Sequence, residues 1–159
     1  MVNVTTFISK AGELRTLDED YPSPIRPVSG TTYSFPSNAD NLSDMALDDW
    51  LLFLGAWRGH MVYQLSKIDG ELYILTEGYS LLQSTAIARL ESDSSKKLLK
   101  DSLIGQALVE NPELQTLKLR VIDLSAELKI LKGRLSLYES QFDTISRVVT
   151  RRGQERFKI

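Results

Sequence analysis

The chain has 159 residues, 42% of them hydrophobic and 25% charged, and a net charge of −2, which is typical of one ordinary globular domain. It contains no cysteine and one histidine, which excludes disulfides, thiolate metal sites, cysteine nucleophiles and sites built from several histidines. The N-terminus lacks a basic stretch followed by an apolar run, and no apolar segment approaches the roughly 20 residues that span a bilayer. We therefore expect a soluble, cytoplasmic protein with no membrane partner.

Residues 1–42 have the features of an extended or disordered arm. Four of the five prolines of the chain lie here, and proline interrupts a helix because it lacks a backbone N–H and clashes with the preceding turn. The arm also carries aromatic side chains that can dock on a neighbouring surface, namely Phe7, Tyr21, Tyr33 and Phe35. The sequence thus predicts an arm over residues 1–42 and a helical domain over residues 43–159.

A long amphipathic helix is predicted to begin near Ser43 and to end near Glu91. Apolar residues recur at alternating intervals of three and four, which is the period of a heptad seam and not of a strand. Ser43 or Asn41 is a candidate N-cap. The seam has twelve positions, eleven of them apolar, namely Leu47, Leu51, Leu54, Arg58, Met61, Leu65, Ile68, Leu72, Leu75, Tyr79, Leu82 and Ala86.

A short amphipathic helix is predicted over residues 96–110, followed by a last long helix. Asn111 is expected to cap the last helix, with Pro112 in its first turn and fraying after Gly153. This helix has apolar residues at strict heptad spacing over five heptads, which predicts the main oligomerisation seam. The predicted oligomerisation residues are Leu114, Leu117, Val121, Leu124, Leu128, Leu131, Leu135, Tyr138, Phe142 and Ile145, and the seam continues to Val149.

Two long helices with sustained seams are expected to pair as a hairpin and then to associate between chains. Additional apolar residues beside the second seam, such as Leu119, Ile122, Ala126 and Ile130, exceed what one partner helix can cover. The predicted fold class is all-α. It is a long helical hairpin with a short connecting helix, which forms an oligomeric coiled coil or bundle.

No motif for catalysis, nucleotide binding or metal binding is present. The sequence lacks GxxxxGK[ST], GxGxxG, HExxH and GxSxG. The single histidine, His60, lies on the long helix beside Gly59 and is interpreted as a surface or packing residue. We therefore expect a protein that is not an enzyme and that uses no cofactor or metal.

The charges are distributed unevenly, which suggests a polyanionic partner for the C-terminal part. Residues 1–93 contain 6 basic and 13 acidic residues, whereas residues 94–159 contain 13 basic and 8 acidic residues. The candidate nucleic-acid contacts are the basic residues Lys118, Lys129, Lys132, Arg134, Arg147, Arg151 and Arg152. In the alternative interpretation they only form interhelical ion pairs with Glu127, Glu139 and Asp143.

Two segments of the last helix resemble the UvsY family, the recombination mediators of tailed phages. Lys132-Gly-Arg-Leu-Ser-Leu-Tyr138 is similar to the Lys-x-Arg-Leu-x-x-Tyr segment of that family, although there it lies nearer the N-terminal half. The end of the helix, Phe142-Asp-Thr-Ile-Ser-Arg147 followed by Thr150-Arg151, also looks like the family's C-terminal helix. The resemblance carries over only Lys132 and Arg134 as DNA-contact candidates.

The resemblance implies a small helical oligomer that binds single-stranded DNA and assists recombinase loading. Its protein partners would be a recombinase and a single-strand-binding protein, in a host cell's cytoplasm if a phage encodes the chain. The alternative is a coiled-coil structural or assembly protein, such as a virion scaffold or adaptor, without nucleic-acid binding.

Overall fold

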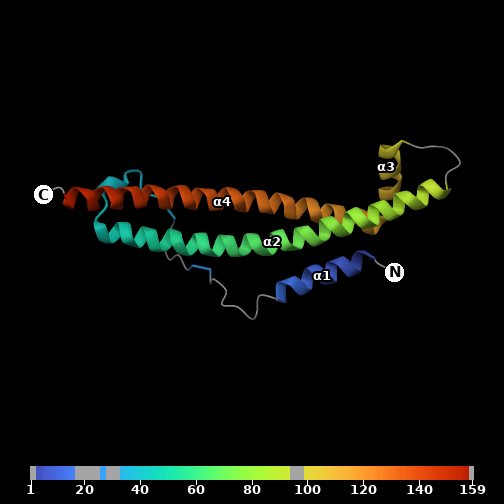
Figure 1. Cartoon of the computed structure of the whole chain (residues 1–159), viewed down its shortest axis with the longest axis horizontal. Helices are drawn as coiled ribbons and strands as arrows, with labels where there is room; N and C mark the ends of the chain where they lie inside the picture. Colours follow the sequence, from blue (N-terminus) through green and yellow to red (C-terminus); the bar gives the residue numbers. More distant parts are fainter. Residues whose placement is uncertain (1–2, 17–25, 28–32, 94–98, 158–159) are drawn as a thin grey trace. The chain divides into compact units, whose positions relative to one another are not determined.

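A computed structural model describes residues 3–16, 26–27, 33–93 and 99–157. These residues form four α-helices and one 3₁₀ turn and contain no strand, so the all-α class is confirmed for the described part of the chain (Figure 1). The elements are α1 (Val4–Thr16), η1 (Ala39–Asn41), α2 (Asp44–Asp93), α3 (Lys100–Glu110) and α4 (Pro112–Arg156).

Helix α2 agrees closely with the predicted seam helix. None of its twelve seam positions is exposed, and Leu47, Leu54 and Leu75 are almost completely buried. Ser43 caps the start, because its hydroxyl accepts a hydrogen bond from the N–H of Ala46 at 3.2 Å. The period of the apolar residues therefore identified both the helix and the face that it buries.

The predicted boundaries of the other helices differ in detail. Helix α3 begins at Lys100, and residues 96–98 of the predicted helix lie outside the described residues. Helix α4 begins at Pro112, and the backbone carbonyl of Asn111 accepts hydrogen bonds from the N–H groups of Leu114 and Gln115. The side-chain amide of Asn111 donates to the Ala107 carbonyl of α3 at 2.7 Å, so the predicted side-chain cap of α4 is wrong. Helix α4 continues through Gly153 to Arg156, so the predicted fraying at that glycine is wrong.

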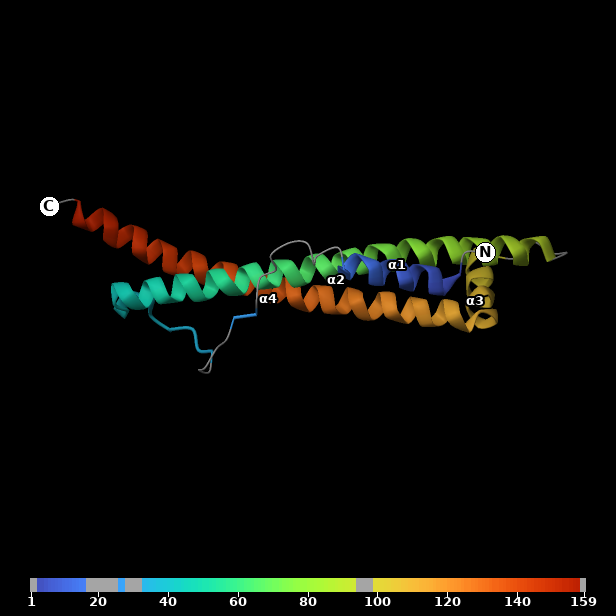
Figure 2. The same ribbon diagram turned by 90° about the horizontal axis from the view of Figure 1, so that it is seen from below.

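The contacts divide the chain into two units. The first comprises residues 1–21 and 66–128, and the second comprises residues 22–65 and 129–159. In the first unit, α1 packs beside the C-terminal part of α2 and the N-terminal part of α4 (Figure 2). Its core contains Val4, Ala11, Leu75, Tyr79, Leu114, Leu117 and Leu124.

Helix α1 contradicts the expectation of an extended or disordered arm over its residues. Thr6 donates its backbone N–H to the side-chain oxygen of Asn3 at 3.1 Å, which caps the helix. Val4 and Ala11 are buried against the long helices. The prolines that suggested an extended chain all follow residue 21, so none of them prevents a helix over Val4–Thr16.

In the second unit, the N-terminal part of α2 runs antiparallel to the C-terminal part of α4. Asp44 at the start of α2 binds Arg152 near the end of α4, and Arg58 lies 4.0 Å from Glu139. The segment from Tyr33 to Leu42 packs on this pair through its aromatic side chains. The core residues are Ala39, Leu47, Leu54, Ile145 and Val148.

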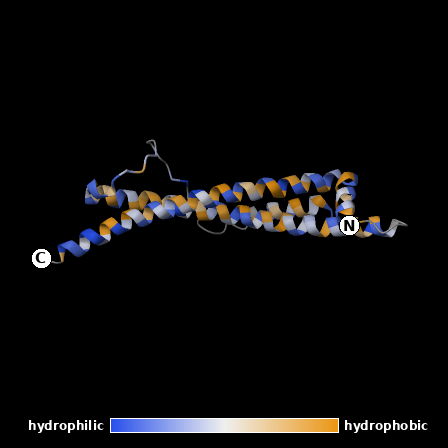
Figure 3. Ribbon diagram, turned by 90° about the horizontal axis from the view of Figure 1, so that it is seen from above, coloured by the Kyte–Doolittle hydropathy of each residue, from blue (hydrophilic) through white to orange (hydrophobic). Residues whose placement is uncertain are grey.

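The predicted oligomerisation residues already have partners inside the chain. All ten are buried or half-buried, and seven of them belong to the two cores or pack against them. Hydrophobic residues recur along both long helices, whereas hydrophilic residues dominate the C-terminal end of α4 (Figure 3). The large apolar side chains of α4 that stay more exposed belong to the additional set or lie close to it, namely Leu119, Ile122, Ile130 and Leu137.

Candidate nucleic-acid interface

Two of the seven candidate basic residues bind groups of the chain itself. Arg151 forms an ion pair with Asp40. Arg152 donates one hydrogen bond to Asp44 Oδ1 at 2.7 Å and two more to the backbone carbonyls of Asp40 and Leu42, at 2.6 and 2.7 Å. Both side chains therefore connect the end of α4 to residues 40–44, which lead into α2 and form its start. The placement of these two arginines favours a structural role over a contact with phosphate.

The contacts at the end of α4 lower the pKa of the Asp44 carboxyl group. Hydrogen bonds from Arg152 and Arg156 hold the pKa of Asp44 below its usual value of 3.8. The ionised form of Asp44 is thus favoured in the folded chain. The stability that this preference provides is present above the unfolded pKa and is lost as the pH falls through the folded pKa.

Lys118 lies in the first unit, away from the other six candidates in the sequence. Its ammonium group lies 4.7 Å from the centroid of the Tyr79 ring, which is a cation–π distance. Tyr79 is 8% exposed, and burial raises the pKa of its hydroxyl. Lys118 therefore covers a core aromatic ring and is only half exposed.

The other four candidates, Lys129, Lys132, Arg134 and Arg147, are exposed on the C-terminal part of α4. Within the described part of the chain, none of them forms an ion pair with a carboxylate. At about 100° per residue, Lys129 and Arg147 share one face, Lys132 is displaced by about 60°, and Arg134 lies about 140° around the helix. These cations therefore surround the seam on more than one side instead of forming a single stripe.

A shallow hollow of about 320 Å³ lies on the surface of α4 and includes one of these exposed cations. It is lined by Asp143, Ser146, Arg147, Thr150, Arg151 and Gln154. The carboxylate of Asp143 offsets part of its positive charge. The hollow is therefore polar and weakly charged.

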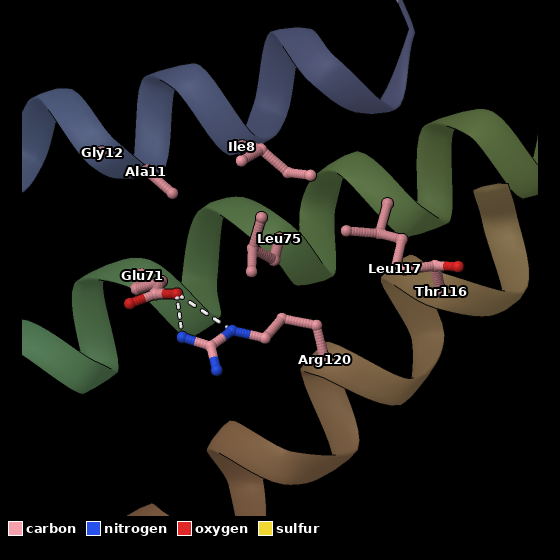
Figure 4. Close-up of a pocket in the computed structure, with 8 residues that line it drawn as sticks. All are labelled: Ile8, Ala11, Gly12, Glu71, Leu75, Thr116, Leu117 and Arg120. Atoms are coloured by element: carbon pink, nitrogen blue, oxygen red, sulfur yellow. Dashed lines mark hydrogen bonds and ion pairs between the residues drawn. The ribbon is translucent and has the colours of Figure 1, made fainter.

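A pocket of about 370 Å³ lies in the first unit between α1, α2 and α4 (Figure 4). Its walls are mostly apolar, with Ile8 and Ala11 from α1 facing Leu75 and Leu117. At one side, Arg120 Nε and Nη2 donate hydrogen bonds to Glu71 Oε1 at 3.2 and 2.7 Å. Glu71 is 8% exposed, whereas the side chain of Arg120 is 47% exposed, so only the carboxylate of this ion pair is buried.

An aromatic cluster in the second unit was only partly anticipated. The sequence marks Tyr33 and Phe35 as docking residues of the arm, and Phe35 contacts Trp50 with ring centroids 5.5 Å apart. Neither the position of Tyr33 among α2 and α4 rings nor the Glu71–Arg120 pair had a sequence signal. Both contacts join residues far apart in the chain, so local patterns do not predict them.

The described residues contain no group of three or more metal-ligand side chains, and among them no helix is long and apolar enough to cross a membrane. No family model, curated protein or solved structure matches the chain. The resemblance to the UvsY family therefore rests on the two short segments of α4, and it stays a hypothesis.

Proposed function

We propose that this chain is a non-enzymatic protein that binds single-stranded DNA through α4 and assists the loading of a recombinase. The observation that carries the proposal is the set of four exposed cations, Lys129, Lys132, Arg134 and Arg147, without carboxylate partners in the described residues. Exposed lysine and arginine side chains that have no carboxylate partner can supply the phosphate contacts that dominate binding to nucleic acid.

The arrangement of the acidic residues supports this proposal over ion pairing alone. Glu139, one of the expected partners of the cations, lies 4.0 Å from Arg58. Neither Lys132 nor Arg134 contacts Glu139 or Glu127 within ion-pair distance in the described residues. Their charges thus remain available for a ligand in solution. The resemblance adds a recombinase and a single-strand-binding protein as the proposed protein partners.

The proposal is tested by titrating a fluorescent single-stranded oligonucleotide with the protein at several salt concentrations. Replacing both Lys132 and Arg134 by alanine should weaken binding to all sequences alike. The slope of log affinity against log salt should become shallower by about 0.7 for each lost contact. Helicity and thermal stability should not change, because both residues are exposed and alanine favours a helix.

A matched control removes two positive charges elsewhere. Lys10 and Lys100 are exposed on α1 and α3, and replacing both by alanine should leave the salt slope unchanged. If the α4 variant and this control had the same slope as the wild type, phosphate contact by Lys132 and Arg134 would be refuted.

A second candidate function is a structural or assembly protein that binds other chains through an apolar helix face. The exposed side chains Leu119, Ile122, Ile130 and Leu137 favour it, with exposed fractions of 62, 50, 71 and 40%. A wild-type protein that forms large assemblies but does not bind the oligonucleotide at low salt would favour this function.

A further inference from the structure

Tyr33 lies in a cage of aromatic rings in the second unit. Its ring is stacked on Phe53, with centroids 5.8 Å apart and an interplanar angle of 19°. Trp50 and Tyr138 meet it edge-on, with centroids 6.1 Å away in both cases. A flat ring that is stacked on one side and bordered by two perpendicular rings has the environment of a bound aromatic ligand.

The segment that carries Tyr33 is not part of a helix, and the side chain remains 37% exposed. Its hydroxyl donates a hydrogen bond to the side-chain oxygen of Gln141 on α4. Within the described residues, this hydrogen bond and the three ring contacts hold the side chain. Tyr33 is therefore attached to the cage by interactions that another planar polar group can also make.

Positive charge lies next to the cage. Burial raises the pKa of Tyr33, Tyr138 raises it further, and the nearby guanidinium of Arg134 lowers it. Arg26 lies over the ring of Trp57 at 5.9 Å from its centroid. A ligand that places an aromatic group in the cage and a phosphate outside it would meet these cations.

The cluster also contains a hydrogen-bond donor without a partner. Trp57 packs against Phe53 and Tyr138, and its Nε1 is buried and makes no hydrogen bond within the described residues. Most buried donors of this kind are satisfied in folded proteins. A carbonyl group of a nucleobase is an acceptor that such a donor can bind.

We propose that the ring cage formed by Trp50, Phe53 and Tyr138 binds a base of single-stranded nucleic acid, and that Tyr33 occupies the place of this base in the free protein. This inference rests on the proposed function and adds a base-stacking site to its phosphate contacts. Stacking of this type tolerates every base, because each base has a flat π-face. Tyr33 then competes with the nucleic acid for the cage.

The chain provides its own probe for this site. Its only two tryptophans, Trp50 and Trp57, both belong to the cluster, so intrinsic tryptophan fluorescence reports on the cage. The protein is titrated with short oligothymidine and, in parallel, with an abasic oligonucleotide of the same length. Oligothymidine should quench the fluorescence, whereas the abasic strand should bind through phosphate without quenching it.

Variants separate competition by Tyr33 from a merely structural role. Replacing Tyr33 by alanine should tighten binding of oligothymidine by about 2- to 10-fold, the factor by which one aromatic pair favours the occupied cage. It should leave binding of the abasic strand unchanged. Tyr33→Leu, which keeps apolar volume but removes the ring, provides the same test if the alanine variant does not fold. Phe53→Leu should weaken oligothymidine binding by about 10-fold, because a base loses its stacking partner.

The matched control is Tyr73→Ala, which removes an aromatic ring of α2 that is 69% exposed and lies outside the cluster. It should not change either titration. Equal affinity for both oligonucleotides, no quenching by oligothymidine and no effect of Tyr33→Ala would overturn the inference while leaving the proposed function intact. If neither strand binds in a salt-dependent manner, the proposed function fails, and the base-stacking site fails with it.

Discussion

Glu71 is the residue whose environment is least like that of an ordinary surface carboxylate. It is 8% exposed, and both hydrogen bonds from the Arg120 guanidinium meet the same oxygen atom. The Arg120 side chain remains 47% exposed. The two partners therefore differ in what each would lose if the other were removed, because only the arginine retains access to water.

We expect this asymmetry to appear in the free energy of unfolding. Arg120→Ala leaves a buried carboxylate without two charge-assisted hydrogen bonds, at a cost of about 1–3 kcal/mol. Glu71→Gln keeps the shape and leaves a half-exposed guanidinium, so it should cost less than about 1 kcal/mol. Urea denaturation of both variants measures the difference. The control is Arg89→Ala, an exposed arginine of α2 in the same unit, which should have little effect. Equal costs for the two partner substitutions would contradict this interpretation.

At the scale of single helices, α2 contains glycines in two different environments. A Cβ atom added at Gly78 would overlap the ring of Phe7 on α1, whereas one added at Gly59 would meet nothing within 4 Å. Gly78 is buried and Gly59 is exposed. The close approach of α1 to α2 therefore depends on the missing side chain at position 78.

Alanine substitutions at these glycines should have opposite effects on stability. Gly59→Ala should stabilise the protein by up to about 1 kcal/mol, because alanine is the better helix former. Gly78→Ala gains the same propensity but displaces Phe7, so it should be destabilising overall. Thermal unfolding measures both. In a Phe7→Ala background the clash is absent, and Gly78→Ala should then stabilise. A stabilising effect of Gly78→Ala in the wild-type background would show that α1 does not pack there in solution.

At the scale of the whole molecule, the seam residues of α4 are already covered by other parts of the same chain. The large apolar side chains of α4 that remain exposed are Leu119, Ile122, Ile130 and Leu137, and α2 also exposes others, such as Leu52 and Val62. Large exposed apolar residues at near-heptad spacing on one helix are typical of an association surface. An oligomer therefore stays a prediction, and these exposed α4 residues are candidates for contacts with a second copy.

We expect the wild-type protein to sediment as an oligomer larger than a dimer at micromolar concentration. Replacing Ile122 and Ile130 by glutamate should lower the mass without reducing helicity, because both side chains are exposed. As a control, Val109→Glu places the same charge on an exposed residue of α3 and should not change the mass. A monomeric wild-type protein in analytical ultracentrifugation would refute oligomerisation.

The sequence by itself predicted the features that depend on local periodicity. The three- and four-residue spacing identified α2 and α4, and most of the side chains that these helices bury are seam residues. Ser43 was recognised as an end signal because capping involves groups within about one turn, whereas the side chain of Asn111 bonds the Ala107 carbonyl of α3 and does not cap α4 as predicted. Such features are encoded in neighbouring residues and need no knowledge of the tertiary structure.

Only the tertiary structure decided which partners the polar and aromatic side chains of distant segments have. Arg151 and Arg152 were indistinguishable in sequence from Lys132 and Arg134, yet they bind Asp40 and Asp44, more than 100 residues earlier in the chain. Helix α1 was not predicted because of the prolines that follow it, and its burial depends on contacts with α2 and α4. The physical reason is the same in each case, because these contacts join segments whose proximity arises only when the long helices pair.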